Sequence, residues 1–203
     1  MQLLKSERCI GANVTIPHKI EAIELCGELT EKAEIAGSVN TIFKAGGRII
    51  GDNTDGAGLV KWLKIKGVDL KNCAILGNGG SARAIAAALF EEKSEITVFG
   101  RTEKGWEKNF GSFHNLSEWK DDVFTISTLP FEVEGNNLVN IGYSSEKINI
   151  DATMMLAFQG RLAALRWFGK TVTEESFARI TLLHAKAQSN QMFILNLATK
   201  NEI

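Results

Sequence analysis

The sequence predicts an α/β protein in which a smaller α/β domain precedes a doubly wound parallel sheet. Between residues 70 and 155, short apolar segments alternate with helical segments, a pattern typical of parallel sheets. A glycine-rich turn at 77–80 separates one of these apolar segments from an alanine-rich helix. Residues 1–56 lack this alternation and predict a strand, a helix and two further strands.

The composition is that of an ordinary globular protein of one or two domains. The 203 residues are 44% hydrophobic and 23% charged and include only two prolines, which excludes a disordered chain. A net charge of −1 creates no field that would attract nucleic acid or an anionic membrane. The longest apolar run, Ala84–Phe90, is too short to cross a bilayer, and the N-terminus has no apolar segment typical of a secretory signal. We therefore expect a cytoplasmic protein with neither nucleic-acid nor membrane partners.

Neither a metal site nor a disulfide framework is expected. The three cysteines and three histidines lack the spacing of zinc ligands or of paired cysteines. These residues are Cys9, Cys26, Cys73, His18, His114 and His184.

The first part of the chain contains two kinds of predicted element. Cys9–Ile16 predicts a strand that ends at Pro17, and Pro17 favours a helix from His18 to Leu29. Val39–Lys44 and Arg48–Gly51 flank Ala45-Gly46-Gly47 and predict a hairpin. An apolar stripe then predicts a helix over Gly56–Lys66.

The second part predicts the parallel sheet and its helices. We expect strands at Cys73–Leu76, Glu95–Phe99, Asp122–Thr128 and Lys147–Ala152. Helices are expected at Ser81–Glu92, Met154–Phe168 and Glu174–Lys200.

The glycine-rich turn indicates a dinucleotide site of the Rossmann type. In the segment GNGGSARA, Gly77 permits a tight turn, and Gly79 and Gly80 let backbone amides approach a pyrophosphate. The helix that begins near Ser81 directs its positive end at the same place. A plain strand–helix turn is the alternative interpretation, but the strand–loop–helix context favours dinucleotide binding, with Asn78 as part of the loop.

The residues after the next strand favour NADP over NAD. Proteins that bind NAD usually carry an acidic residue there for the ribose 2′-hydroxyl, whereas this chain has Arg101 and Thr102. A guanidinium can hold a 2′-phosphate through two parallel hydrogen bonds. The alternative is that Arg101 is an ordinary surface residue.

Three polar clusters, at 13–19, 37–41 and 51–56, lie at the ends of predicted strands or the starts of helices. Asn13 and Asn40 could bind hydroxyl groups, and Lys19 with Asp55 could transfer a proton. Each cluster alone could be a capped turn, and Asp55 could be the N-cap of the helix that follows it.

Taken together, the motifs NVTIPHK (13–19), GSVNT (37–41), NTDGAG (53–58), GNGGSARA (77–84) and GRT (100–102) resemble the shikimate dehydrogenase family. The resemblance implies a two-domain enzyme of the chorismate pathway that reduces 3-dehydroshikimate to shikimate with NADPH. Its substrate is a small ring hydroxy acid. By resemblance, Lys19 and Asp55 are catalytic, Thr15 and Asn40 bind substrate hydroxyls, and Glu31, Gly77, Asn78, Gly79, Gly80, Ser81, Arg101 and Thr102 bind the cofactor.

The resemblance also implies the domain organisation. Residues 1–56, joined by a C-terminal helix at about 174–203, correspond to a shortened substrate domain, and residues 57–173 correspond to the NADP-binding domain. Family members have a longer segment before the lysine motif, so the chain is expected to be either a fragment or a short natural form. We expect a monomer or a homodimer.

Some motif positions depart from the family or have two matches. Gly100 stands where the family has Asn, and the family's D-x-x-Y pattern appears at Asp151 without its tyrosine. The family's substrate-binding glutamine matches Gln159 by local sequence and Gln188 by overall spacing, and a strand at 147–152 favours Gln188. The missing N-terminal segment and the missing tyrosine leave a second hypothesis open, a dinucleotide-binding module with weak or no catalysis. A third hypothesis is a quinate or NAD-linked variant, which would require that Arg101 does not bind the cofactor.

Overall fold

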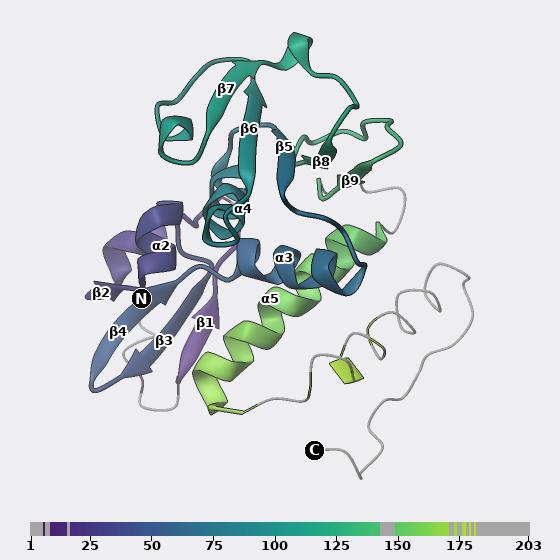
Figure 1. Ribbon diagram of the computed structural model, residues 1–203. Coiled ribbons are helices and arrows are strands. Elements are labelled where there is room, and N and C mark those ends of the chain that lie inside the picture. The colour runs from purple at the N-terminus through teal and green to yellow at the C-terminus, as the bar shows by residue number, and fades with distance from the viewer. Residues whose placement is uncertain are drawn as a thin grey trace.

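The computed structural model describes residues 6, 9–15, 17–142, 149–170, 173, 176, 177, 179 and 181. They form two separate sheets, with strand orders β1-β3-β4-β2 and β7-β6-β5-β8-β9 (Figure 1). All pairs of neighbouring strands in the five-stranded sheet are parallel. The predicted α/β fold with a doubly wound parallel sheet and a smaller α/β unit is therefore confirmed.

The four-stranded sheet is built from the first quarter of the chain. Its strands are β1 (Gly11–Asn13), β2 (Glu28–Leu29), β3 (Thr41–Ala45) and β4 (Arg48–Asp52), and its helices are η1 (Glu21–Leu25), a 3₁₀ helix, and α2 (Glu31–Ala36). The predicted hairpin is confirmed, since β3 and β4 pair from Ala45↔Arg48 to Thr41↔Asp52 around a turn at Gly46 and Gly47.

The predicted helix at 18–29 is wrong beyond its first part. The 3₁₀ helix η1 ends at Leu25, and Glu28 and Leu29 pair in parallel with β4. The backbone N–H of Gly27 already donates to the carbonyl oxygen of Ile49 at 2.9 Å. Pairing with the sheet therefore takes the backbone groups that a longer helix would need.

The five-stranded sheet contains β5 (Asn72–Leu76), β6 (Glu95–Gly100), β7 (Ser112–Asn115), β8 (Phe124–Ser127) and β9 (Leu138–Asn140). The helices that accompany it are α3 (Asp55–Ile65), α4 (Gly80–Glu91), η2 (Glu107–Asn109), η3 (Leu116–Glu118) and α5 (Ile150–Phe168). The strands predicted at 73–76, 95–99 and 122–128 and the helices predicted at 56–66, 81–92 and 154–168 are all present.

The strand predicted at 147–152 is wrong where the structure describes it. Ile150, Asp151 and Ala152 form the first turn of α5, because the side chain of Asn149 caps the helix by accepting from the backbone N–H of Ala152. The edge strand is instead β9, at Leu138–Asn140. Residues 147 and 148, and most of the helix predicted at 174–200, lie outside the described residues.

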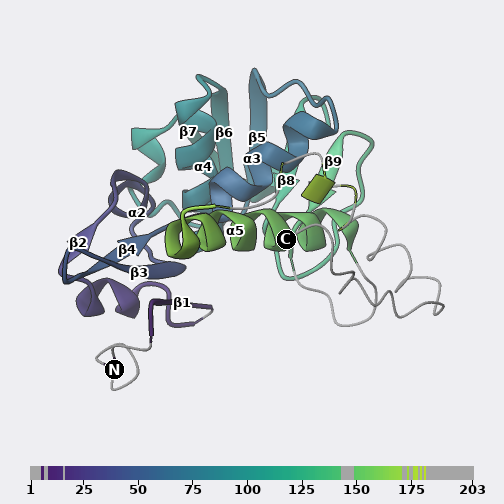
Figure 2. The same cartoon turned by 90° about the horizontal axis from the view of Figure 1, so that it is seen from below.

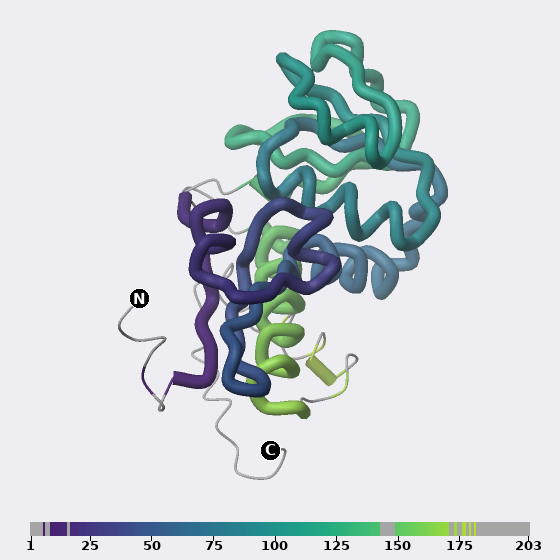
Figure 3. The backbone as a smooth tube through the Cα atoms, turned by 90° about the vertical axis from the view of Figure 1, so that its left-hand side faces the viewer, coloured from purple at the N-terminus to yellow at the C-terminus, as the bar shows by residue number. Residues whose placement is uncertain are grey.

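Helix α5 runs along both sheets (Figures 1 and 2). Near its start, Met154 and Phe158 lie in the larger hydrophobic core. At its other end, the indole N–H of Trp167 donates to the carbonyl oxygen of Ile42 in β3 at 3.0 Å. Figure 3 shows the β3–β4 hairpin beside the same end of α5. This one helix therefore links the two sheets.

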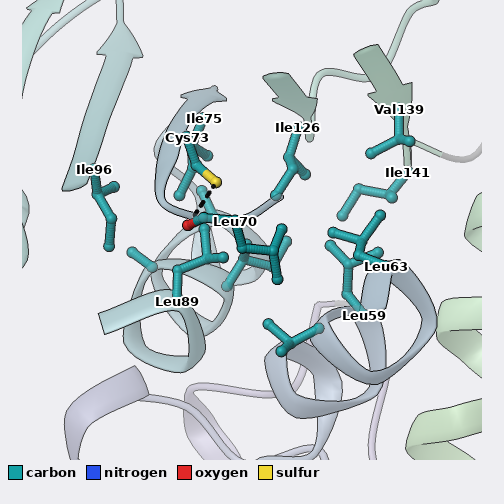
Figure 4. Close-up of a cluster of buried hydrophobic side chains, with 14 of the residues drawn as sticks. Leu59, Leu63, Leu70, Cys73, Ile75, Leu89, Ile96, Ile126, Val139 and Ile141 are labelled. Atoms are coloured by element: carbon teal, nitrogen blue, oxygen red, sulfur yellow. Dashed lines mark hydrogen bonds between the residues drawn. The ribbon is translucent and has the colours of Figure 1, made fainter. Parts of the chain in front are cut away.

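Two clusters of buried side chains stabilise the structure. The larger one fills the space between the parallel sheet and helices α3 and α4, where Leu59, Leu63 and Leu89 face Ile75 and Ile126 (Figure 4). The smaller one, centred on Ala22, Ala33, Val39 and Ile42, lies against the four-stranded sheet. Among the described residues, no helix is both long enough and apolar enough to cross a membrane.

Candidate active site

A cleft of about 520 Å³ opens at the carboxyl ends of β5, β6 and β8. In an open parallel sheet, ligands bind at this edge where the strand order reverses, and here it reverses at β5. The cleft is lined from one side by the glycine-rich turn and from the other by the segment around Lys19. Its lining residues are Pro17, Lys19, Ile20, Ser38, Gly77, Asn78, Gly79, Gly80, Ser81, Gly100, Arg101, Lys104, Leu116, Thr128, Leu129 and Pro130.

The glycine-rich turn has the geometry of an anion-binding loop. Gly77 has φ +94°, and a Cβ at this position would lie 2.5 Å from the hydroxyl of Thr128, so only glycine fits. Helix α4 begins at Gly80, and its N-cap residue is Gly79, which has no side chain to cap the N-terminus. The first backbone N–H groups of α4 are therefore free to bind an anion from the cleft.

Two positively charged side chains line the cleft together with the glycine-rich turn. Arg101 follows β6 directly, is exposed and lines the cleft, as does Lys104 three positions later. Thr102 is also exposed but is not among the residues that line the cleft, and its carbonyl oxygen accepts from the side chain of Asn78 at 2.7 Å. Lys104 was not among the residues predicted from the sequence, although it is a second cation shortly after Arg101.

Lys19 and Asp55 come from different segments and are in contact. The ammonium Nζ of Lys19 lies 2.6 Å from Oδ2 of Asp55. Asp55 is only 5% exposed and begins α3, where the positive end of the helix stabilises its charge. Lys19 is less buried and reaches the cleft, so the carboxylate holds the ammonium from the buried side.

Asn40 connects this pair to helix α5. Its amide nitrogen donates to Oδ1 of Asp55 at 2.8 Å and to Oε1 of Gln159 at 3.0 Å. Its oxygen accepts from the backbone N–H of Thr54 at 2.8 Å. Asn40 and Gln159 are both buried, and their contact places the middle of α5 next to the Lys19–Asp55 pair.

The structure removes the reason for preferring Gln188 over Gln159. That preference depended on a strand at 147–152, where the structure instead has the start of α5. Gln159 lies beside Asn40, whereas Gln188 lies outside the described residues. Asp151, matched to the D-x-x-Y pattern, lies in the first turn of α5 and accepts hydrogen bonds from Trp62 and Lys66 at 2.7 and 2.9 Å.

Three other residues that the sequence suggested as ligands are not among the residues that line the cleft: Thr15, Glu31 and Asn13. Thr15 and Glu31 are exposed. Asn13 accepts a hydrogen bond from the hydroxyl of Thr41 at 3.3 Å. In the part of the chain that the structure describes, no three His, Cys, Asp or Glu side chains gather as metal ligands would.

The strand order around β5, together with a glycine-rich turn that leads into α4, defines a Rossmann-type α/β protein. Comparison with known proteins shows what this chain is similar to. A family model described as the shikimate dehydrogenase substrate binding domain matches residues 1–42.

Curated relatives and solved structures agree with this match. Shikimate dehydrogenase (NADP(+)) of Gluconobacter oxydans is 50% identical over 93 residues, which are 45% of this chain and 33% of that protein. The enzyme of the same name from Vesicomyosocius okutanii is 36% identical over 159 residues, 75% of this chain and 53% of its own. The chain thus spans about a third to a half of the length of these relatives.

The fold is similar to that of a shikimate 5-dehydrogenase from Thermus thermophilus, solved with NADP(H) and shikimate. The TM-score is 0.73 at 26% identity, over 88% of this chain and 80% of that one. A shikimate dehydrogenase from Aquifex aeolicus gives a TM-score of 0.69 at 28% identity, over 86% and 77%. The chain is therefore similar to shikimate dehydrogenases in sequence and in fold, in agreement with the resemblance of its motifs.

Proposed function

We propose that this chain acts as an NADP-dependent oxidoreductase that interconverts 3-dehydroshikimate and shikimate, or a similar ring hydroxy acid. The observation that carries the proposal is the Lys19–Asp55 pair, whose lysine lines the same cleft as the glycine-rich turn. The named functions of the related proteins support it.

The same proposal places NADP in this cleft. The free N-terminus of α4 and the turn at 77–81 would hold the pyrophosphate. Arg101, with Lys104 beside it, would hold a 2′-phosphate, because both are cations and both line the cleft. When bound, NADPH supplies the hydride that reduces a carbonyl carbon.

The protein's own groups then handle the proton. As hydride reaches the carbonyl carbon, the oxygen gains negative charge and must take up a proton. The ammonium of Lys19 donates that proton and takes it back in the reverse direction. Asp55 keeps the ammonium in place, and Asn40 fixes the second oxygen of that carboxylate. Gln159 accepts from Asn40 at 3.0 Å and so helps to keep Asn40 in place against Asp55.

The second candidate is a dinucleotide-binding module without efficient catalysis. It is favoured by the position of Thr15 and Glu31, since these two expected ligands do not line the cleft.

Two measurements on the purified chain separate the candidates. Calorimetric titrations with NADP and with shikimate measure binding, and absorbance at the NADPH band measures turnover of shikimate with NADP. The proposed enzyme binds both ligands and forms NADPH. Binding of NADP with neither shikimate binding nor turnover would overturn the proposal in favour of the module.

A further inference from the structure

A buried carboxylate lies beneath the segment that carries the two cations. Glu107 begins η2 and is 0% exposed. Its Oε1 accepts from the side-chain amide of Asn78 at 2.7 Å and from the backbone N–H of Lys104 at 3.1 Å, and its Oε2 lies 3.2 Å from the same N–H. A buried charge is costly unless such partners satisfy it, so this residue is held in one position.

The ionisation of Glu107 agrees with this geometry. Burial raises the pKa of its carboxyl, but the hydrogen bonds from Asn78 and from backbone amides of the 104–107 segment lower it more, and the pKa lies below the usual range for glutamate. Glu107 is therefore an anion that accepts hydrogen bonds and does not donate them.

Asn78 joins two loops. Its backbone belongs to the glycine-rich turn, while its side-chain nitrogen donates to Glu107 and to the carbonyl oxygen of Thr102, each at 2.7 Å. Its amide lies over Gly100, where a Cβ would come within 3.0 Å of the Asn78 side chain. A residue larger than glycine at position 100 would displace that amide.

We propose that Asn78 and Glu107 are positioning residues for cofactor specificity. They hold the 101–104 segment against the glycine-rich turn, so that Arg101 and Lys104 stand where a 2′-phosphate would lie once the pyrophosphate is bound. The inference rests on the proposed function only for dinucleotide binding and is independent of catalysis. Side chains held in position in advance lose less entropy on binding, which raises affinity for the group that they contact.

Electrostatics and positioning predict opposite results for one substitution. Glu107→Gln removes a negative charge near the anion site, and simple electrostatics would then strengthen phosphate binding. The glutamine amide, however, would present N–H groups where a carboxylate oxygen now accepts from Asn78 or Lys104. If Glu107 acts by positioning, the substitution weakens binding of the 2′-phosphate.

The test is calorimetric titration with adenosine 2′,5′-bisphosphate (2′,5′-ADP) and with 5′-AMP. These probes differ only by the 2′-phosphate and require no turnover. The wild type is expected to bind 2′,5′-ADP more tightly. Asn78→Ala and Glu107→Gln should each weaken binding of 2′,5′-ADP at least about tenfold and binding of 5′-AMP less than about threefold. Glu103→Gln, which removes a charge from the same segment without these hydrogen bonds, is the matched control and should change neither affinity by more than about twofold.

The proposal would be overturned if the wild type bound both probes with equal affinity. It would also be overturned if the variants lost the same affinity for both probes, or if they bound 2′,5′-ADP as tightly as the wild type or more tightly. Should Glu107→Gln fail to fold by circular dichroism, Asn78→Ala decides, because Asn78 is only half-buried. If the wild type prefers 2′,5′-ADP but does not turn over shikimate, the proposed reaction fails and the specificity proposal stands.

Discussion

The side-chain amide of Asn40 donates to Oε1 of Gln159 at 3.0 Å, across 119 positions of the chain. This contact joins the segment before β3 to the middle of α5, next to Asp55. The position of α5 and the position of the Asp55 carboxylate are thus coupled through one buried amide.

Replacement of Asn40 should therefore destabilise the fold. Asn40→Ala leaves the N–H of Thr54 without its acceptor and Oδ1 of Asp55 without the amide that donates to it. Each buried polar group that loses its partner costs about 1–3 kcal/mol, so the free energy of unfolding should fall by about 2–4 kcal/mol in urea titrations. Asn137→Ala, at an exposed position, is the control and should change it by less than about 0.5 kcal/mol. A loss in Asn40→Ala no larger than in the control would contradict the coupling.

Asp55 should be required for activity. Asp55→Asn keeps the size of the side chain but removes the charge that holds the Lys19 ammonium at 2.6 Å. General acid–base groups contribute about 10²–10⁴-fold, so kcat for shikimate oxidation should fall at least about 10²-fold. The Kd for NADP should stay within about threefold, because Asp55 is not among the residues that line the cleft. An unchanged kcat would show that the carboxylate has no part in the reaction.

The ion pair between Asp52 and Arg166 should hold α5 to the smaller sheet. Nε of Arg166 lies 2.7 Å from Oδ2 of Asp52, whose side chain is 2% exposed, while that of Arg166 is 43% exposed. Because Arg166 is partly solvated, Arg166→Ala should cost about 1–2 kcal/mol of unfolding free energy, less than the loss of a fully buried pair. Arg48→Ala breaks the more exposed pair with Glu28 and should cost less than about 1 kcal/mol. The reverse order of the two losses would contradict this account.

Glu107 should make the stability of the protein depend on acid pH. Its pKa in the folded state is lowered, so its contribution is complete above the unfolded-state pKa of about 4.3 and is lost as the pH falls through the folded-state pKa. The difference in unfolding free energy between the wild type and Glu107→Gln should therefore be largest near neutral pH and shrink below about pH 4. Urea titrations from pH 7 to pH 3 measure this difference in unfolding free energy. A difference that increases as the pH falls would contradict the prediction.

Local patterns predicted much of the fold because they depend on nearby residues. Helices α3 and α4, the β3–β4 hairpin and the glycine-rich turn follow from periodicity and from turn residues. The two failures, at 18–29 and 147–152, concern segments whose state is decided elsewhere. In the segment 18–29, Glu28 and Leu29 pair with β4 and cannot continue a helix. In the segment 147–152, Asn149 caps the start of a helix.

The site was predicted in part for the same reason. Motifs pointed to Lys19, Asp55 and Asn40, which the structure brings together. Lys104 and Glu107 were missed, because their relation to the cleft depends on how the 101–107 segment folds back on Asn78. In the sequence, Gly100 was only a departure from the family motif. In the structure, the side-chain amide of Asn78 lies against Gly100 and leaves little space for a larger residue.

We propose that Lys19 moves a proton in the cleft that would also hold the dinucleotide. This role is tested by comparing wild type, Lys19→Met and the exposed control Lys71→Met, each measured for kcat with shikimate and for Kd with NADP. We predict that Lys19→Met loses at least about 10²-fold in kcat with a Kd within about threefold of wild type, and that Lys71→Met matches wild type in both. Equal kcat values for Lys19→Met and the wild type would contradict the claim.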